Sequence, residues 1–262
     1  MGPQGPVVLV TLRPDRLVLR AERKTCSRLL VKAPHVNTGF PVSPAVLRHF
    51  LACLHLPQTG LFLLHPTFPP GLGTGASTAS LIAIARLAGF KGSPSVLAQA
   101  CVAAEGASDP LMFGQSDRLI WASREARIVA TRLPLPRAQL LAGFFGPALP
   151  TRAADTDYDD ISDLVTAWQQ ARSVAECAAI ACESASRCLA RRGPSDDPTA
   201  QLAKDLGARG WAASHSGAAR ALIFDPGTLP QQGAALLTEA GLRNVQPLFT
   251  GGDNGQRVGR HA

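Results

Sequence analysis

Short apolar runs and helix-like stretches are interleaved through the first half of the chain. Positions 7–12 and 17–23 are apolar and rich in β-branched residues, and Arg13-Pro14-Asp15 lies between them. Two such runs around a turn-forming segment are typical of paired strands, so we expect a β-hairpin here. The strands predicted in this half cover residues 7–12, 17–23, 29–33, 60–66, 118–122 and 126–133.

The helices of this half are predicted mainly from their start signals. Ser43-Pro44 and Ser93-Pro94 each place a capping serine ahead of a proline at the first helical position. A further helix follows a cluster of glycines at positions 71, 73 and 75. The predicted helices cover residues 44–55, 76–88 and 94–105.

The second half has a longer helical pattern, which runs from residue 158 to residue 189. Ser173 and Glu176 have the spacing of a capping box, so we divide this pattern into two helices that meet near residue 172. The other elements predicted here are helices over 198–206 and 231–240, and strands over 139–146, on both sides of the Ser-His-Ser-Gly turn at 214–217, and over 243–249.

Strands and helices follow one another without strict alternation, which favours an α+β fold with layered antiparallel sheets. The proline-containing segment LPLPRAQ, residues 133–139, has the composition of a joint between two bodies. We therefore expect two lobes, residues 1–136 and 137–262.

Composition narrows the class of protein. The chain has 262 residues, 46% of them hydrophobic, which is enough for a substantial core. It has no apolar run of about 20 residues and no charged segment followed by an apolar one at its start, so we expect a cytoplasmic protein with no membrane partner. None of the six cysteines forms a C-x-x-C pair, which argues against a zinc site and a disulfide framework.

The net charge of +7 raises the question of a nucleic-acid partner. Proteins that bind nucleic acids concentrate basic residues on one face, often with aromatic residues among them. Here the arginines are scattered and aromatic residues make up only 5% of the chain, so we expect no nucleic-acid partner. The charge is compatible with a small anionic substrate. We expect the protein to be a monomer or a homodimer.

The glycine cluster in PPGLGTGASTAS, residues 69–80, is the main candidate for chemistry. Glycines before a helix let an anion approach the free amides of its first turn, where the helix dipole is positive. Ser77 and Thr78 add hydroxyl groups that bind phosphate or magnesium in other phosphate loops. The segment has no lysine after its last glycine, so it is not a Walker A motif. A plain connecting loop remains the alternative.

Three segments together resemble the GHMP kinase superfamily. The segment 69–79 is similar to the second motif of these kinases, a Pro-x-Gly-x-Gly-Leu-Gly-Ser-Ser-Ala loop, with Thr74 and Ala76 in place of its Leu and first Ser. The segment 207–226, with its Ser-His-Ser-Gly core, resembles the third motif, and 105–113 resembles an acidic stretch of the family. The Ser-Thr-Ala ending and the third segment resemble the branch that phosphorylates L-threonine in cobalamin synthesis.

This resemblance implies a two-lobed fold, with an N-terminal lobe like a ribosomal-protein domain, a ferredoxin-like C-terminal lobe, and ATP between them. It implies an ATP- and Mg²⁺-dependent kinase, with Mg²⁺ held by Ser77 and Glu105 and with Asp109 accepting or orienting the proton of the substrate hydroxyl. The residues implied in ATP binding are Pro69, Gly71, Gly73, Thr74, Gly75, Ala76, Ser77 and Thr78. Those implied in lining the substrate site are Ser214, His215, Ser216 and Gly217.

Other interpretations of the same residues remain open. Glu105 would also fit a solvated helix end, Asp109 a turn before Pro110, and Ser77 a helix cap. The first motif of the family would precede the strand at 7–12, and this sequence begins just after that point. A nucleotide-binding relative without kinase activity, a homoserine kinase and a basic RNA-associated domain are therefore kept as alternatives to a threonine kinase.

Overall fold

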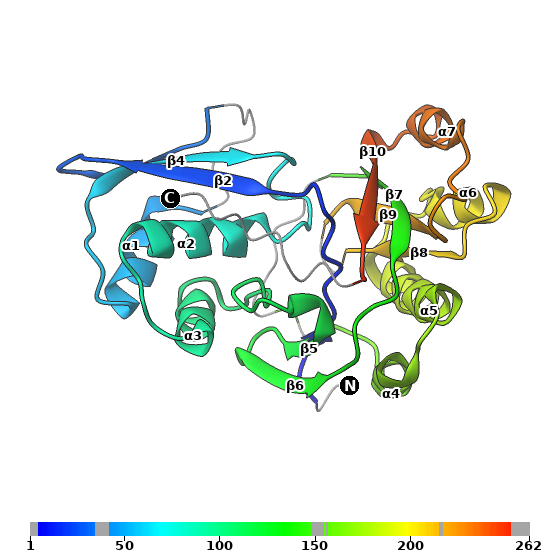
Figure 1. Cartoon of the computed structure of the whole chain (residues 1–262), viewed down its shortest axis with the longest axis horizontal. Helices are drawn as coiled ribbons and strands as arrows, with labels where there is room; N and C mark the ends of the chain where they lie inside the picture. Colours follow the sequence, from blue (N-terminus) through cyan, green and yellow to red (C-terminus); the bar gives the residue numbers. More distant parts are fainter. Residues whose placement is uncertain (1–4, 35–41, 148–154, 156, 215–216, 253–262) are drawn as a thin grey trace.

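The structure of the chain is a computed structural model that describes residues 5–34, 42–147, 155, 157–214 and 217–252. Within them lie three β-sheets with helices beside them (Figure 1). The helices are α1 (Pro44–Cys53), α2 (Ala76–Leu87), α3 (Pro94–Glu105), the 3₁₀ helix η1 (Ser116–Arg118), α4 (Ser162–Gln170), α5 (Val174–Arg192), α6 (Thr199–Asp205) and α7 (Gly233–Glu239). The strands are β1 (Val8–Leu9), β2 (Leu19–Lys24), β3 (Leu29–Lys32), β4 (Gly60–Pro66), β5 (Leu119–Ala122), β6 (Arg127–Thr131), β7 (Ala138–Phe144), β8 (Gly210–Ala213), β9 (Ala219–Phe224) and β10 (Arg243–Thr250).

The first sheet has the order β2-β4-β3, with β2 antiparallel and β3 parallel to the central β4. Side chains of β4 alternate between buried and partly exposed, as expected of a strand with one covered face. Phe62 and Leu64 on the covered face pack with Phe50 of α1 and with Leu81 and Ile84 of α2. Figure 1 shows α1 and α2 beside this sheet, so the sheet positions the start of α2.

The largest sheet is fully antiparallel, in the order β10-β7-β9-β8. Leu222 and Phe224 of β9 are almost completely buried and pack in one cluster with Trp211 of β8 and Leu237 of α7. Helices α5, α6 and α7 lie beside this sheet in Figure 1, at the opposite end of the molecule from α1. This sheet carries the turn between β8 and β9, which belongs to the third segment of the resemblance.

The third sheet, β1-β5-β6, contributes to a core that draws on both halves of the sequence. Ile120 of β5 and Val8 of β1 pack in one hydrophobic cluster with Trp168 of α4 and Cys177 of α5. The predicted division into lobes at residue 136 stays a prediction. The cluster shows that residues before and after position 136 share buried contacts.

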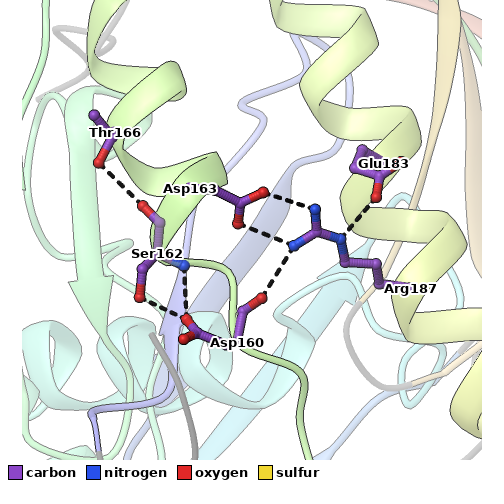
Figure 2. A network of polar contacts seen from close by, with 6 residues as sticks. All are labelled: Asp160, Ser162, Asp163, Thr166, Glu183 and Arg187. Atoms are coloured by element: carbon purple, nitrogen blue, oxygen red, sulfur yellow. Dashed lines mark hydrogen bonds and ion pairs between the residues drawn. The ribbon is translucent and has the colours of Figure 1, made fainter.

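Ion pairs tie α4 to α5 (Figure 2). The guanidinium of Arg187 on α5 donates to both carboxylate oxygens of Asp163 on α4, at 2.9 and 2.7 Å, and to Glu183 at 2.7 Å. It also donates to the backbone carbonyl oxygen of Asp160 at 3.0 Å. A planar guanidinium can make all these bonds at once because its donors form a fixed fork.

The acidic segment before α4 is bound to the same end of α5. Arg191 contacts Asp157 and Asp159, and Arg192 contacts Asp155, each at 2.6 Å. These carboxylates are each paired with an arginine of α5.

One prediction about pairing is wrong. The apolar runs at 7–12 and 17–23 do not form a hairpin, because β1 pairs with β5 and β2 pairs with β4. The segment between them is bonded to β10 instead: Asp15 donates to and accepts from the backbone of Phe249, at 2.9 and 3.0 Å. The backbone amide of Arg13 likewise donates to Thr250 at 3.2 Å. These bonds tie the segment to β10, and the two runs that it joins belong to different sheets.

The other predicted pairings are confirmed. Strands β5 and β6 pair antiparallel, and so do β8 and β9 around the Ser-His-Ser-Gly segment. The predicted capping box is present, since Ser173 and Glu176 each bond to the backbone amide of the other residue. No helix among the described residues is long and apolar enough to cross a membrane.

Candidate active site

The glycine loop lies between the end of β4 and the start of α2. Gly71, Gly73 and Gly75 have φ angles of +78°, +85° and +72°, in the left-handed region where a side chain is strained. Gly75 precedes α2 and no side chain caps this helix end. The amides of the first turn therefore keep their donors for an external acceptor, at the positive end of the helix dipole.

The acidic segment packs directly onto this loop. A Cβ added to Gly75 would lie 3.1 Å from Oδ2 of Asp109 and 3.2 Å from Cδ1 of Leu111. The backbone amide of Asp109 donates to the hydroxyl of Thr78, in the first turn of α2, at 3.2 Å. Asp109 and the start of α2 are therefore adjacent.

The segment that carries Asp109 is anchored by hydrogen bonds to β5 and to the residue after it. The indole Nε1 of Trp121 donates to the carbonyl oxygen of Ser108 at 2.7 Å, and the amide of Ser108 donates to the carbonyl of Ser123 at 2.8 Å. Trp121 is fully buried in the hydrophobic cluster that also contains Phe50 and Phe62. The backbone next to Asp109 is thus anchored to the interior of the protein.

The third segment reaches the glycine loop from the largest sheet. The amide of Ala219 donates to the carbonyl oxygen of Leu72 at 3.0 Å. A Cβ added to Gly217 would lie 2.8 Å from the carbonyl carbon of Leu72 and 2.9 Å from the amide nitrogen of Gly73. Glycine is needed at 217 because the two backbones touch there. The fold thus brings all three segments of the resemblance together.

Glu105 is the last residue of α3 and accepts a hydrogen bond from the Ser77 hydroxyl in the first turn of α2. Burial raises the pKa of Glu105, and the nearby charge of Asp109 raises it further, while the bond from Ser77 acts in the opposite direction. Burial also raises the pKa of Asp109, against the effect of its hydrogen bond with Thr78. Neither carboxylate has an arginine or lysine ion-pair partner among the described residues.

The thiol of Cys101, one turn before Glu105 on α3, is affected by the same carboxylates. Burial raises its pKa to about 12, and the charges of Glu105 and Asp109 add to this effect. Burial is the largest cause of all three shifts, and nearby carboxylate charge adds to it for Glu105 and Cys101. A cation bound there would offset the charge of the two carboxylates.

The donor set fits magnesium and a polyphosphate. Mg²⁺ uses oxygen ligands and commonly takes only one or two from the protein, the rest coming from phosphate and water. Ser77 and Glu105 supply two such oxygens, and no group of three His, Cys, Asp or Glu side chains among the described residues forms an all-protein metal site.

Two hydroxyls provide a second test of this fit. The side-chain oxygens of Thr74 and Ser214 are buried and have no hydrogen-bond partner within the described part of the chain. Buried hydroxyls without partners are costly, so a ligand that bonded to them would be stabilised. One lies on the glycine loop and the other on the β8–β9 turn, the two segments that the resemblance assigns to ATP and to substrate.

The remaining predicted residues are placed as follows. Pro69 lies at the start of the loop, and Gly71 is exposed, with no atom within 4 Å of the position that a Cβ would take there. Ala76 is buried at the start of α2. His215 and Ser216 lie outside the described residues. The roles of all these residues stay predictions, while the adjacency of their segments is observed.

Sequence reasoning missed one pair beside the site, Asp197 and Arg220. Nε of Arg220 lies 2.7 Å from Oδ2 of Asp197, and both side chains are buried. The signal was visible as a charged residue inside the apolar strand ARALIF. A charge at a buried strand position requires a partner, which the pattern of the strand alone does not identify.

No protein-family model matches the sequence, and no curated protein matches it. Solved structures do match. A protein from Listeria monocytogenes described as a homoserine kinase has a TM-score of 0.64 at 17% identity, with 92% of this chain and 89% of that chain covered. Mevalonate kinase from L. major, solved with R-mevalonate, has a TM-score of 0.61 at 11% identity, with 88% and 85% covered. Homoserine kinase from Cytophaga hutchinsonii has a TM-score of 0.55 at 15% identity, with 88% and 84% covered. The chain therefore has the α+β fold of GHMP kinases over about nine-tenths of its length.

Proposed function

We propose that this protein is an ATP-dependent kinase that phosphorylates the hydroxyl group of a small molecule, and that the acceptor is L-threonine. The observation that carries the proposal is the meeting of three distant segments at the start of α2: the glycine loop, the Glu105–Asp109 stretch and the Gly217–Ala219 backbone. The fold is the one found in homoserine and mevalonate kinases, which supports the reaction class.

The residues of the site would have separate roles in binding phosphate and metal, as phosphoryl transfer requires. Such a reaction needs positioned phosphates and stabilised charge rather than covalent help from the protein. The amides from Gly73 to Thr78 would hold the phosphates of ATP, and Ser77 with Glu105 would hold Mg²⁺. When bound, the metal supplies charge compensation on the phosphate oxygens.

Asp109 has the role closest to the acceptor. Its carboxylate would accept the proton of the substrate hydroxyl while that oxygen forms its bond to the γ-phosphorus and the bond to ADP breaks. Burial makes this carboxylate more basic than an exposed aspartate, which suits a proton acceptor. The backbone anchors through Trp121 and Thr78 hold it beside the first turn of α2.

The choice of acceptor rests on the resemblance of the glycine loop and the third segment to the threonine-phosphorylating branch, whose product, threonine phosphate, feeds the aminopropanol linker of cobalamin. L-homoserine is the second candidate, because two of the similar structures are described as homoserine kinases. The two amino acids differ in the position of their hydroxyl, and a few hydrogen bonds would decide between them.

The test is an ADP-release assay with L-threonine, L-homoserine and other small alcohols. We expect turnover with L-threonine and a loss of several hundred-fold in the Asp109→Asn variant, on the order of 10²–10⁴ for a positioned base. Glu125→Gln is the matched control, since Glu125 is an exposed carboxylate paired with Arg127 and should not affect turnover. ATP binding by calorimetry without turnover on any acceptor would instead support a nucleotide-binding relative without activity.

A further inference from the structure

A buried ion pair lies under the turn that meets the glycine loop. The side chains of Arg220 and Asp197 are only 2% and 7% exposed, and Nε of Arg220 lies 2.7 Å from Oδ2 of Asp197. Asp197 is held in turn by Thr199, whose amide and hydroxyl donate to its other oxygen at 3.0 and 2.5 Å. Both residues are therefore fixed before any ligand binds.

The guanidinium is connected to the backbone of the turn. Its Nη1 donates to the carbonyl oxygens of Gly217 and Ala219, at 3.2 and 3.0 Å. Ala219 is also the residue whose amide donates to Leu72, and Gly217 is the residue that touches Leu72 and Gly73. One chain of contacts thus runs from Asp197 through Arg220 and the turn to the glycine loop.

Stability alone does not account for this pair. Burying two charges carries a large desolvation cost, and replacing a buried ion pair by apolar side chains of similar size is often neutral or stabilising. A pair retained at that cost is more easily explained by the geometry it enforces. Here the geometry is the position of Gly217 and Ala219 against the loop that would hold ATP.

We infer that Arg220, oriented by Asp197, is a positioning residue that holds the glycine loop in its ATP-binding conformation through the Gly217–Ala219 backbone. This inference rests on the proposed function for its effect on ATP. It also makes a claim about the loop that holds without any ligand. Arg220 itself does not touch the glycine loop, so its effect passes through the turn.

The experiment compares wild type with the double variant Arg220→Met/Asp197→Leu and the single variant Arg220→Lys. The double variant removes both charges and should fold. The lysine keeps the charge but has one nitrogen, so it cannot bond Asp197 and the two carbonyls together as Nε and Nη1 of Arg220 do. The control is Arg209→Met/Asp225→Asn, an exposed ion pair at the other end of the same β8–β9 hairpin, with a distance of 2.7 Å.

Two readouts separate this inference from the proposed function. Hydrogen exchange without ligand should be faster at the amide of Ala219, which donates to Leu72 of the glycine loop, in both Arg220 variants, and unchanged in the control. The Kd for ATP with magnesium should rise about tenfold or more, since small displacements of positioning groups cost up to roughly 10²-fold.

Exchange of the Ala219 amide at the wild-type rate in a folded Arg220 variant would overturn the inference, and so would an unchanged Kd for ATP. If the double variant does not fold, the lysine variant decides in the same way. Wild-type protein that fails to bind ATP, with an Ala219 amide that still exchanges faster in the variants, would reject the proposed function and leave the structural link intact.

Discussion

The Ser77 hydroxyl donates a hydrogen bond to the Glu105 carboxylate, which joins the first turn of α2 to the last turn of α3. The two residues are the predicted magnesium ligands, and the structure places their oxygens in direct contact. Within the protein itself, the carboxylate is held by a neutral hydroxyl in a partly buried place. A carboxylate in this position lowers the stability of the protein, and a bound metal would offset that cost.

The first prediction concerns the stability of the protein in the absence of ligand. The pKa of Glu105 is raised by burial, so the folded state binds its proton more tightly than the unfolded state. Stability should therefore decrease as the pH rises from the ordinary carboxyl range through the raised pKa. Glu105→Gln should remove this loss and raise Tm at neutral pH, by roughly 2–4 °C. Thermal unfolding at pH 5 and pH 8 measures it, and a lower Tm in the variant at pH 8 would contradict it.

The second prediction concerns the pH dependence of magnesium binding. Protonation of Glu105 and Asp109 competes with the cation, and both have raised pKa values. The affinity for Mg²⁺ with ATP should therefore begin to fall, on acidification, at a higher pH than an ordinary carboxylate with a pKa of about 4.3 would cause. Calorimetric titrations from pH 5 to pH 8 test this, with Glu105→Gln expected to flatten the profile.

The third prediction uses two glycines with the same backbone angle and different surroundings. Gly71 and Gly75 have φ of +78° and +72°, but only Gly75 would place a Cβ against Asp109, at 3.1 Å. Each change to alanine should cost about 1–2 kcal/mol of backbone strain. Only Gly75→Ala should also lower turnover strongly, because it displaces Asp109. Equal turnover in the two variants at a temperature where both are folded would refute this.

The fourth prediction concerns thiol reactivity. Burial and two carboxylates raise the pKa of Cys101 to about 12, so its reactive thiolate form is scarce at neutral pH. Cys53 is exposed and serves as the internal control. Iodoacetamide at pH 8 should modify Cys53 and leave Cys101 unmodified in the folded protein, as measured by peptide mass spectrometry. Modification of both at similar rates would show that the α3 end opens readily.

The fifth prediction separates the ion pairs of α4 and α5 from the site. Arg187 binds Asp163, Glu183 and the Asp160 carbonyl, and its side chain is 28% exposed. Arg187→Met should cost on the order of 1 kcal/mol, with a loss that shrinks at high salt, as is typical of exposed ion pairs. Turnover at 25 °C should be unchanged. Urea unfolding at two salt concentrations measures the first effect.

Much of this architecture could be predicted from the sequence, because the signals are local. Ser43-Pro44, Ser93-Pro94 and the Ser173–Glu176 box act within one helical turn, and each helix begins where they predicted. The true partners of the runs at 7–12 and 17–23 could not be predicted, because they lie on β5 and β4, and the segment between the runs is bonded to β10. All three strands lie far along the chain. The α+β fold of GHMP kinases was predicted from motifs and is confirmed by the solved structures.

The site was partly predictable for the same reason. The resemblance pointed to the segments that carry Ser77, Glu105 and Asp109, and these segments meet, while the roles of the three residues stay predictions. The link from Asp197 to Arg220 was not predictable, because residues 23 positions apart meet only after the hairpin and α6 have formed. The same holds for Trp121, whose bond to Ser108 joins a core strand to the acidic segment.

The bond between Leu72 and Ala219 has a consequence for synthesis on the ribosome. The glycine loop leaves the exit tunnel long before the β8–β9 turn exists, so early in translation its backbone lacks the neighbour that it has in the finished protein. The segment around Asp15 gains its partner later still, because Phe249 lies on β10. A nascent chain stopped before β8 should therefore be unable to capture a nucleotide, however well its first sheet has formed.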